Sequence, residues 1–379
     1  MRVAVFAESY LPYLSGVTIS TDALVRGLAA AGHDVLLVAP RAGGEAPEVV
    51  GDAVWLPSYQ LPGPVPVGYR MPWPVPSAAL QAAVAFGPDI VHAQSPFVSG
   101  LMARAVARRA GAPLVFTHHT RFADYRHYLG PLARPGSAAV DAYVRRYWAA
   151  CAAVIAPSHH LAAEIEVRLA GIRKRPLVRV VPTGLDLVAL RLLPRADPRK
   201  LAGWPDDTVV VASLGRLAPE KSVDGLVDAF AAAVGEEPRL RLMLIGGGPL
   251  EEELRRRAAT IGTLHLSGRL RHSDALMLLK GADLFAFASR TETQGLVLAE
   301  ALACGLPAVA RAGPAIDESV RDGVDGLIVP SMGDLSAALV GLARSPERRA
   351  ELARGARAGS DRFGLERRIE EVVSVYREL

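Results

Sequence analysis

The amino-acid sequence predicts an α/β fold with two parallel sheets, each covered by helices on both faces. Three observations support this prediction. Short apolar segments typical of buried strands alternate with longer helical segments along the chain, as they do in doubly wound sheets. The alternation stops near residues 182–186 and then starts again. The chain has 379 residues, half of them apolar, which is enough for two packed cores.

The first half begins with a βαβ unit. Residues 2–7 and 35–40 have the pattern of buried strands, and residues 16–31 have that of the helix between them. Residues 41–50 are expected to form a loop. Further strands of this sheet are predicted at residues 90–92, 114–116, 153–156 and 178–181.

A proline-rich segment interrupts this series. Residues 57–76 hold seven prolines together with Tyr59, Tyr69 and Trp73. Proline lacks a backbone donor, and its ring clashes with the preceding turn of a helix. This segment is therefore expected to be neither a regular helix nor a central strand.

The second half repeats the alternation. Helices are predicted at residues 222–234 and 251–259, and a last helix at residues 364–377. Because helices connect the strands, the second sheet is also expected to be parallel. Its strands are predicted at residues 209–214, 240–245, 264–266, 284–288, 308–309 and 327–329.

Composition excludes several classes of protein. Cys151 and Cys304 are the only cysteines, so we expect no disulfide framework and a reducing cytoplasm as the location. The apolar N-terminus is too short for a signal peptide, and Glu8 interrupts it. The sequence has no run of about 18 apolar residues, the length that could span a membrane. The sequence has no basic repeat with interleaved aromatic residues, so we expect no nucleic-acid partner.

Charge is distributed unevenly along the chain. Residues 1–180 carry 17 lysines and arginines against 11 acidic residues, whereas the net charge of the whole chain is +4. This excess favours peripheral binding to an anionic membrane surface, the inner face of the plasma membrane. The alternative is a helix over residues 139–150 whose aromatic residues face the core and whose arginines are solvated. The first interpretation relies on the aromatic-proline segment over residues 57–76, and on Tyr143, Tyr147 and Trp148 beside Arg126, Arg134, Arg145 and Arg146.

The most informative motif is the pair Glu292 and Glu300. Gly295 marks a turn between them, and a helical segment begins at Leu296. Backbone N–H groups at a helix N-terminus bind phosphate, and carboxylates accept hydrogen bonds from hydroxyl groups. The segment could therefore hold a nucleotide sugar, with one glutamate at the sugar and the other at the ribose. Two acids at this spacing also occur on ordinary solvated helices.

A pair of cations gives the second signal. Gly215 ends the strand over residues 209–214, and Arg216 and Lys221 follow it. Ligands of α/β sheets gather at the carboxyl ends of strands. An arginine can bind two phosphate oxygens and a lysine can supply a mobile charge, so together they could neutralise a diphosphate without a metal. The alternative is two solvated surface cations.

Glycines follow two other strands. Gly247 and Gly248 come after the strand over residues 240–245, and Gly16 lies in the first strand-to-helix turn. Without a Cβ these residues let the backbone approach a ligand closely. A tight structural turn is the alternative at each position.

Two histidines close a strand of the first half. His118 and His119 follow the strand over residues 114–116. A histidine at this edge can donate a hydrogen bond to a sugar hydroxyl or stabilise positive charge at an anomeric carbon. A structural histidine is the alternative. The sequence has no serine-hydrolase elbow, no His-Glu-x-x-His zinc motif, no Gly-Lys-Ser/Thr loop and no Asp-x-Asp metal clamp.

Taken together, these motifs resemble those of family-4 retaining glycosyltransferases, from Glu8 to the last helix. Glu292 and Glu300 match the E-x7-E spacing, and Arg216 and Lys221 match R-x4-K. His119 is similar to the histidine of members that glycosylate diacylglycerol or phosphatidylinositol, and His118 stands where others carry an aromatic residue.

The resemblance implies a GT-B fold, with two Rossmann-like domains and a deep cleft between them. Residues 1–182 would bind the acceptor, residues 183–361 the nucleotide-sugar donor, and the helix over residues 362–379 would cross back to the first domain. It also implies retention of the anomeric configuration, no cofactor, and no metal. In the mechanism proposed for this family, the leaving phosphate deprotonates the acceptor hydroxyl.

The resemblance also implies a set of site residues. Catalytic roles fall to His119, Arg216, Lys221 and Glu292. Glu8, Tyr10, Tyr125 and Tyr128 are expected at the acceptor. The donor-binding residues are Gly16, Gly215, Gly247, Gly248, Arg269, Leu270, Thr293, Gln294, Gly295, Leu296 and Glu300.

The identity of donor and acceptor is less defined. Gln294 replaces the aromatic residue of the commoner family motif, and with Tyr125, His127 and Tyr128 this variant looks most like enzymes that make diacylglycerol glycolipids. UDP-glucose and a lipid acceptor such as diacylglycerol are favoured. The alternatives are a GDP-mannose-dependent α-mannosyltransferase acting on a glycolipid or phosphatidylinositol, a non-catalytic nucleotide-sugar or lipid-binding module, and a sugar-nucleotide epimerase.

Overall fold

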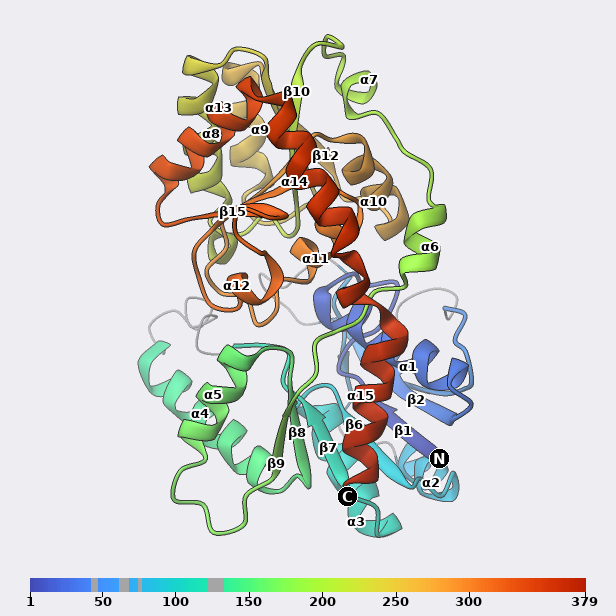
Figure 1. Ribbon diagram of the computed structural model, residues 1–379. Helices are drawn as coiled ribbons and strands as arrows, with labels where there is room; N and C mark the ends of the chain where they lie inside the picture. The colour runs from blue at the N-terminus through green and yellow to red at the C-terminus, as the bar shows by residue number, and fades with distance from the viewer. Residues whose placement is uncertain (42–46, 61–67, 74–76, 122–132) are drawn as a thin grey trace. The chain divides into compact units, whose positions relative to one another are not determined.

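The structure is a computed structural model that describes residues 1–41, 47–60, 68–73, 77–121 and 133–379. Contacts within the chain group these residues into two compact units. Unit 1 comprises Met1–Gly184 together with Leu365–Leu379, and unit 2 comprises Leu185–Gly364. Each unit contains its own sheet (Figure 1).

The main sheet of unit 1 is parallel throughout. Among the described residues it has seven strands in the order β3-β2-β1-β6-β7-β8-β9. The strands are β1 (Arg2–Phe6), β2 (Asp34–Pro40), β3 (Asp52–Leu56), β6 (Ile90–Ala93), β7 (Leu114–Thr117), β8 (Ala153–Ala156) and β9 (Leu177–Val180). Six of them lie where the sequence predicts strands.

The remaining strand, β3, was not predicted. It is an edge strand that pairs only with β2 among the described strands, and most of its residues are half-buried. Its apolar run over residues 53–56 is so short that periodicity alone does not distinguish a strand from a helical segment there, and its strand partner among the described residues, β2, is distant in sequence. A separate antiparallel pair, β4 (Ser58–Tyr59) and β5 (Met71–Pro72), lies within the proline-rich segment.

Helices cover both faces of the sheet in unit 1. Alternate residues of β1 face opposite sides: Val3 and Val5 join the core under α1 and α15, whereas Ala4 and Phe6 join the core on the other face. The helices α1 and α15 lie side by side (Figure 1), and a Cβ on Gly27 would lie 2.4 Å from Ile369 Cγ1. Over the described residues, the helices of unit 1 are α1 (Gly16–Ala30), α2 (Ser77–Ala85), α3 (Val98–Ala110), α4 (Ala133–Ala149), α5 (His159–Arg168) and α15 (Leu365–Arg377).

Unit 2 has a second parallel sheet with apolar cores on both faces. Its six strands run in the order β12-β11-β10-β13-β14-β15. They are β10 (Val209–Leu214), β11 (Leu240–Ile245), β12 (Leu264–Gly268), β13 (Leu284–Phe287), β14 (Ala308–Arg311) and β15 (Gly326–Val329), all at predicted positions.

The helices of unit 2 follow its strands in alternation. They include η2 (Pro219–Lys221), α8 (Val223–Glu236), α9 (Glu251–Ile261), α10 (His272–Gly281) and α11 (Leu296–Ala303) beside the strand ends discussed below. The others are α6 (Leu187–Leu192), α7 (Pro198–Ala202), α12 (Ile316–Ser319), α13 (Met332–Arg344), α14 (Pro346–Ala358) and η3 (Ser360–Phe363).

The aromatic residues of α4 face the core, so part of the membrane interpretation is wrong. Tyr147 and Trp148 are each 2% exposed within the core of unit 1, and the Tyr143 hydroxyl donates to the Pro96 carbonyl. The amphipathic period of the helix, not an interfacial role, explains these aromatic residues. Arg145 and Arg146 are exposed, as the alternative predicted; Arg126 lies outside the described residues.

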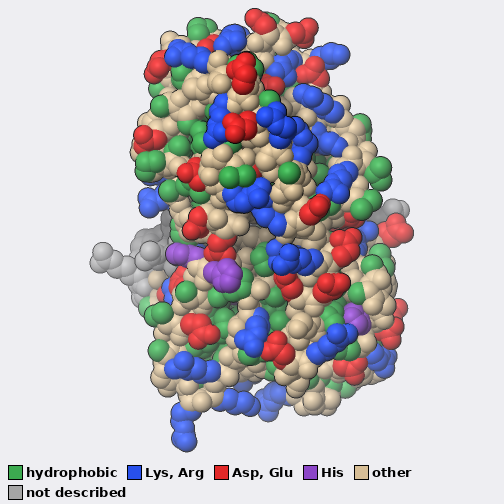
Figure 2. Space-filling model, in the orientation of Figure 1, with side chains coloured by type: hydrophobic (Ala, Val, Ile, Leu, Met, Phe, Trp, Pro, Cys, Tyr) green, Lys and Arg blue, Asp and Glu red, His purple; other side chains and the backbone are tan. Residues whose placement is uncertain are grey.

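No helix in the described part of the chain combines the length and apolarity needed to cross a bilayer. On the face shown in Figure 2, basic and acidic side chains are interspersed.

Candidate functional site

The candidate donor residues of unit 2 lie on loops at one edge of the sheet. β12, β11, β10 and β13 are consecutive neighbours and parallel, so their carboxyl ends meet at the same edge. The loops after these strands carry Arg269, the 246–249 turn, Arg216 and Glu292. The sheet order therefore brings together motifs that the sequence separates by tens of residues.

Glycines allow two of these loops to touch backbone to backbone. Gly246 has φ +137°, and a Cβ on it would lie 2.0 Å from the Gly215 carbonyl oxygen. A Cβ on Gly248 would lie 2.3 Å from the Leu217 oxygen. The Leu217 amide donates to Gly247 O at 3.2 Å. Packing between the loops thus accounts for these glycines without a ligand, and a ligand role for Gly247 and Gly248 stays a prediction.

Both predicted cations pair with glutamates. Lys221 Nζ lies 2.6 Å from Glu292 Oε1, with both side chains largely shielded from solvent. Arg216 Nη1 lies 3.3 Å from Glu220 Oε1, and Glu220 is buried. The loops are joined by Thr291, whose hydroxyl donates to the Glu220 carbonyl at 3.1 Å. The site therefore places cations, which can bind phosphate oxygens, next to carboxylates, which can accept hydrogen bonds from sugar hydroxyls.

Gly295 starts α11 in a left-handed conformation, with φ +77°. This conformation is costly for a residue with a Cβ. It turns the chain from the Glu292 loop into the helix, whose first N–H groups face the loop end. The Gln294 carbonyl accepts a hydrogen bond from the Ser319 hydroxyl at 2.8 Å, which anchors the turn. Leu296 and Leu270 pack partly against the core of unit 2.

Glu300 is more deeply buried than Glu292. It is 1% exposed, and its Oε1 accepts a hydrogen bond from His272 Nε2 at 2.8 Å. Burial by itself lowers the pKa of His272, but the hydrogen bond and the charge of Glu300 outweigh it, so the pKa lies above its ordinary value. The sequence analysis missed His272, although it follows Arg269 and Leu270 at the same strand end.

In unit 1, Glu8 follows β1 and is 7% exposed. Its Oε2 accepts hydrogen bonds from the Ser99 amide at 2.9 Å and the Ser99 hydroxyl at 2.7 Å. Its Oε1 has no hydrogen-bond partner among the described residues. Burial raises the pKa of Glu8, and the bonds to Ser99 oppose that shift. A carboxyl held in this way can accept from, or when protonated donate to, a hydroxyl group.

The other acceptor candidates differ in environment. Tyr10 is buried, and its hydroxyl donates to Asp22 Oδ1 at 2.6 Å. Gly16 is the exposed first residue of α1, behind a capping box formed by Ser15 and Thr18. A Cβ on Gly16 would meet nothing within 4 Å, so packing does not require glycine there. Tyr125 and Tyr128 lie outside the described residues.

The two histidines after β7 have different surroundings. His118 is buried and packs edge-on against Trp148, with ring centroids 5.1 Å apart. His119 is half-buried, and its Nε2 lies 2.7 Å from Gln94 Oε1. Burial lowers the pKa of His118 to about 3 and that of His119 to about 4. Both rings are therefore neutral near pH 7, and His119 is the more accessible of the two.

Within the described ranges, no group of three or more histidine, cysteine, aspartate or glutamate side chains could hold a metal ion.

Two family descriptions match the chain. Residues 14–188 match Glycosyltransferase Family 4, and residues 195–359 match Glycosyl transferases group 1. An α-monoglucosyldiacylglycerol synthase of Acholeplasma laidlawii is 29% identical over 100% of this chain and 97% of its own length. A GDP-mannose-dependent α-mannosyltransferase of Corynebacterium glutamicum is 30% identical over 87% of this chain and 76% of its own length.

Solved structures show the fold. HepE from Anabaena, solved with UDP and glucose, superposes with a TM-score of 0.73 at 18% identity, and the match covers 100% of both chains. The two parallel sheets and the structural similarity to HepE confirm the GT-B fold that the sequence predicts.

Proposed function

Since this chain belongs to glycosyltransferase family 4, we propose that it moves a hexose from a nucleotide sugar to a hydroxyl of a lipid acceptor, with retention of the anomeric configuration. UDP-glucose is the favoured donor and diacylglycerol the favoured acceptor. The full-length relative from Acholeplasma laidlawii is named α-monoglucosyldiacylglycerol synthase, and HepE was solved with UDP-glucose.

The observation that carries this proposal is the charge cluster of unit 2. Lys221 and Glu292 come from different loops and lie 2.6 Å apart, and the Glu292 loop leads through Gly295 into α11. A lysine beside a helix N-terminus suits a diphosphate, and the partner carboxylate suits the hydroxyls of the attached sugar. A plain structural ion pair would not need the helix start at the same place.

The proposed donor contacts follow from these positions. Lys221 and Arg216 offset the negative charge that grows on the diphosphate as the glycosidic bond opens. Glu292 accepts hydrogen bonds from the sugar, and Glu300 from the ribose. Because the cations and the amides of α11 supply the positive charge, the reaction proceeds without a divalent metal, and activity should survive a chelator.

On the acceptor side we assign Glu8 and His119 of unit 1. Glu8 has an oxygen without a partner among the described residues, which suits a hydroxyl. His119 lies at the same carboxyl edge of its own sheet, after β7. The leaving phosphate, not a protein carboxylate, would take the proton from the acceptor.

A product assay tests this function. The purified chain is incubated with UDP-glucose, UDP-galactose or GDP-mannose and with diacylglycerol, phosphatidylinositol or a soluble sugar, and products are identified by mass spectrometry and NMR. We expect an α-glucosyl lipid from UDP-glucose. Lys221→Met should lower turnover about 10- to 100-fold, because a charge-assisted hydrogen bond contributes about 1.5–3 kcal/mol. Lys200→Met, on an exposed position of α7, is the control.

Other outcomes would identify the alternatives. Transfer from GDP-mannose would favour a mannosyltransferase, which the relative from Corynebacterium glutamicum supports by name. Conversion of the donor without any acceptor would indicate an epimerase. Binding of donor without turnover on any acceptor would indicate a non-catalytic module.

A further inference from the structure

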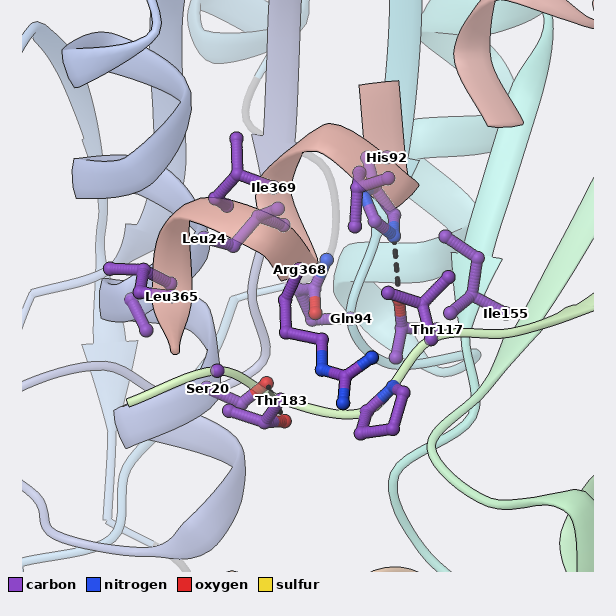
Figure 3. Close-up of a pocket in the computed structure, with 15 residues that line it drawn as sticks. Ser20, Leu24, His92, Gln94, Thr117, Ile155, Thr183, Leu365, Arg368 and Ile369 are labelled. Carbon is purple, nitrogen blue, oxygen red and sulfur yellow. Dashed lines mark hydrogen bonds between the residues drawn. The ribbon is translucent and has the colours of Figure 1, made fainter. Parts of the chain in front are cut away.

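Two polar contacts link the ends of β6 and β7 in unit 1. His92 and Gln94 lie two residues apart at the end of β6, and Thr117 and His119 lie two apart at the end of β7. His92 Nε2 is 2.7 Å from Thr117 Oγ1, and His119 Nε2 is 2.7 Å from Gln94 Oε1. Figure 3 shows the His92–Thr117 contact as a dashed line, with Gln94 nearby. The neighbouring parallel strands thus carry two equivalent cross-strand pairs, the second of which ends on His119.

Gln94 is firmly held in this arrangement. It is 4% exposed, and its backbone amide donates to the Phe6 carbonyl at 2.8 Å. Its Nε2 has no hydrogen-bond partner among the described residues and belongs to a side chain that lines a cavity of about 40 Å³. That volume has room for water, and Ser20 and Thr183 contribute hydroxyl groups to the same lining. An amide nitrogen that faces the cavity can donate to water there. The amide oxygen then faces His119.

This orientation selects one form of the His119 ring. Burial lowers the pKa of His119 to about 4, so near pH 7 the ring carries a single N–H. An amide oxygen only accepts hydrogen bonds. The 2.7 Å contact therefore requires the hydrogen on Nε2, and Nδ1 becomes the accepting nitrogen of the ring.

We propose that Gln94 is a positioning residue that holds His119 in the Nε2–H tautomer, so that His119 serves the reaction as a neutral hydrogen-bond acceptor, not as a donor or a cation. The proposal rests on the proposed function, which assigns His119 to the acceptor side. It deepens that function, because the substrate group facing His119 must then be a donor, such as the acceptor hydroxyl.

The tautomer can be measured directly. Nitrogen-15 NMR of the histidine side chains distinguishes Nε2–H from Nδ1–H, and the resonances of His119 are those lost in His119→Gln. We expect the wild-type ring to be neutral and protonated on Nε2 between pH 6 and 8. Gln94→Met, which keeps the length but removes the oxygen, should give a mixture of tautomers.

Kinetics then separate positioning from folding. Gln94→Met should lower kcat at least about ten-fold with the KM for UDP-glucose within two-fold. Gln94→Glu keeps an accepting oxygen but adds charge, so it should keep the Nε2–H tautomer and move the acidic limb of the pH–rate profile upward by about one unit or more. Thr117→Val removes the neighbouring cross-strand pair and is the matched control; it should leave the His119 tautomer and the acidic limb unchanged.

An Nδ1–H ring in the wild-type protein would overturn the proposal, and so would an unchanged tautomer in Gln94→Met. Because the wild-type tautomer is measured without Gln94→Met, misfolding of that variant does not prevent the test. Absence of transfer from every donor would refute the proposed function and leave the NMR result on Gln94 standing, so the two failures are distinguishable.

Discussion

At the scale of single residues, the site depends on which charges meet. Lys221 and Glu292 are 71 residues apart in sequence, and Glu300 and His272 are 28 apart. Each contact joins a residue with an expected role to a partner on a different loop or helix. The role of a site residue in this protein is therefore set by its partner as much as by its own type.

His272 gives a prediction at this scale. His272→Ala leaves Glu300 buried without its donor, so affinity for UDP-glucose in calorimetry should fall about ten-fold or more, since a hydrogen bond to a charged group contributes about 1.5–3 kcal/mol. Because the folded pKa of His272 is raised, the charged pair is complete below pH 6.5 and is lost as pH rises through that pKa. Wild-type affinity should therefore be higher at pH 6 than at pH 8.5.

His272→Gln keeps a donor without the titration, so it should retain most of the affinity and lose the pH dependence. Arg271→Gln, at a side chain that is 84% exposed, is the neighbouring control. Equal affinity of wild type and His272→Ala would show that the pair is irrelevant to donor binding.

At the scale of elements, the strand ends in unit 2 pack closely enough to exclude side chains. Gly246→Ala would place a Cβ 2.0 Å from the Gly215 oxygen at φ +137°. Either the backbone shifts or the residue is strained, and such strain costs about 1–3 kcal/mol. We expect a loss of stability of at least this size in urea unfolding, together with weaker donor binding because both loops move.

Gly341→Ala is the matched control for this prediction. Gly341 is an exposed residue within α13, and a Cβ there would meet nothing within 4 Å. Alanine should stabilise the helix by about 0.5–1 kcal/mol. A Gly246→Ala protein as stable as the wild type would mean that the two loops can separate without cost.

For the molecule as a whole, histidines whose pKa values are lowered make unit 1 sensitive to acid. Burial lowers the pKa of His92 and His118 to about 3 and that of His119 to about 4. As pH falls below 6.5, the unfolded chain binds protons that the folded chain does not, so stability present above pH 6.5 is lost as pH falls toward these folded pKa values. Each histidine lowers the free energy of unfolding by up to about 1.4 kcal/mol per pH unit over this range. Glu8, whose pKa burial raises, acts in the opposite direction.

Thermal unfolding between pH 7.5 and 4.5 checks this expectation. Tm should fall steeply below pH 6.5. His118→Phe, which removes one titrating ring but keeps an aromatic side chain against Trp148, should reduce the slope. A Tm that stays constant from pH 6.5 to 4.5 would contradict the burial of these rings as neutral species.

Membrane binding is the second prediction for the whole molecule. Fewer residues support it than the sequence suggested, because Tyr147 and Trp148 are buried. Trp73 is 55% exposed and packs against Tyr59, and Arg145 and Arg146 are exposed on α4. A basic residue near an anionic surface contributes about 1 kcal/mol. Co-sedimentation should therefore increase with the anionic fraction of the vesicles and decrease with salt.

Replacing Arg145 and Arg146 with glutamine should weaken this binding. The same change at Arg255 and Arg256, exposed on α9 of unit 2, should not. Binding that ignores lipid charge, or no binding at low salt, would point to a soluble acceptor.

The amino-acid sequence alone predicts the α/β class, most strands of both sheets and the motifs at their carboxyl ends. These features are local: a buried parallel strand is a short apolar run, and a ligand loop follows it directly. Each of the two motifs is short in sequence: Arg216 and Lys221 follow β10, and Glu292, Gly295 and Glu300 lie in the loop after β13 and the start of α11.

The partners of these residues, in contrast, follow from the arrangement of the strands and helices in space. The pairs Gln94–His119, His272–Glu300 and Lys221–Glu292 depend on which strands and helices are neighbours, and local periodicity does not encode that order. The same reason explains the burial of Trp148, which depends on the face that α4 turns to the sheet. It also explains the edge strand β3, whose short apolar run over residues 53–56 is identified as a strand only by its pairing with β2.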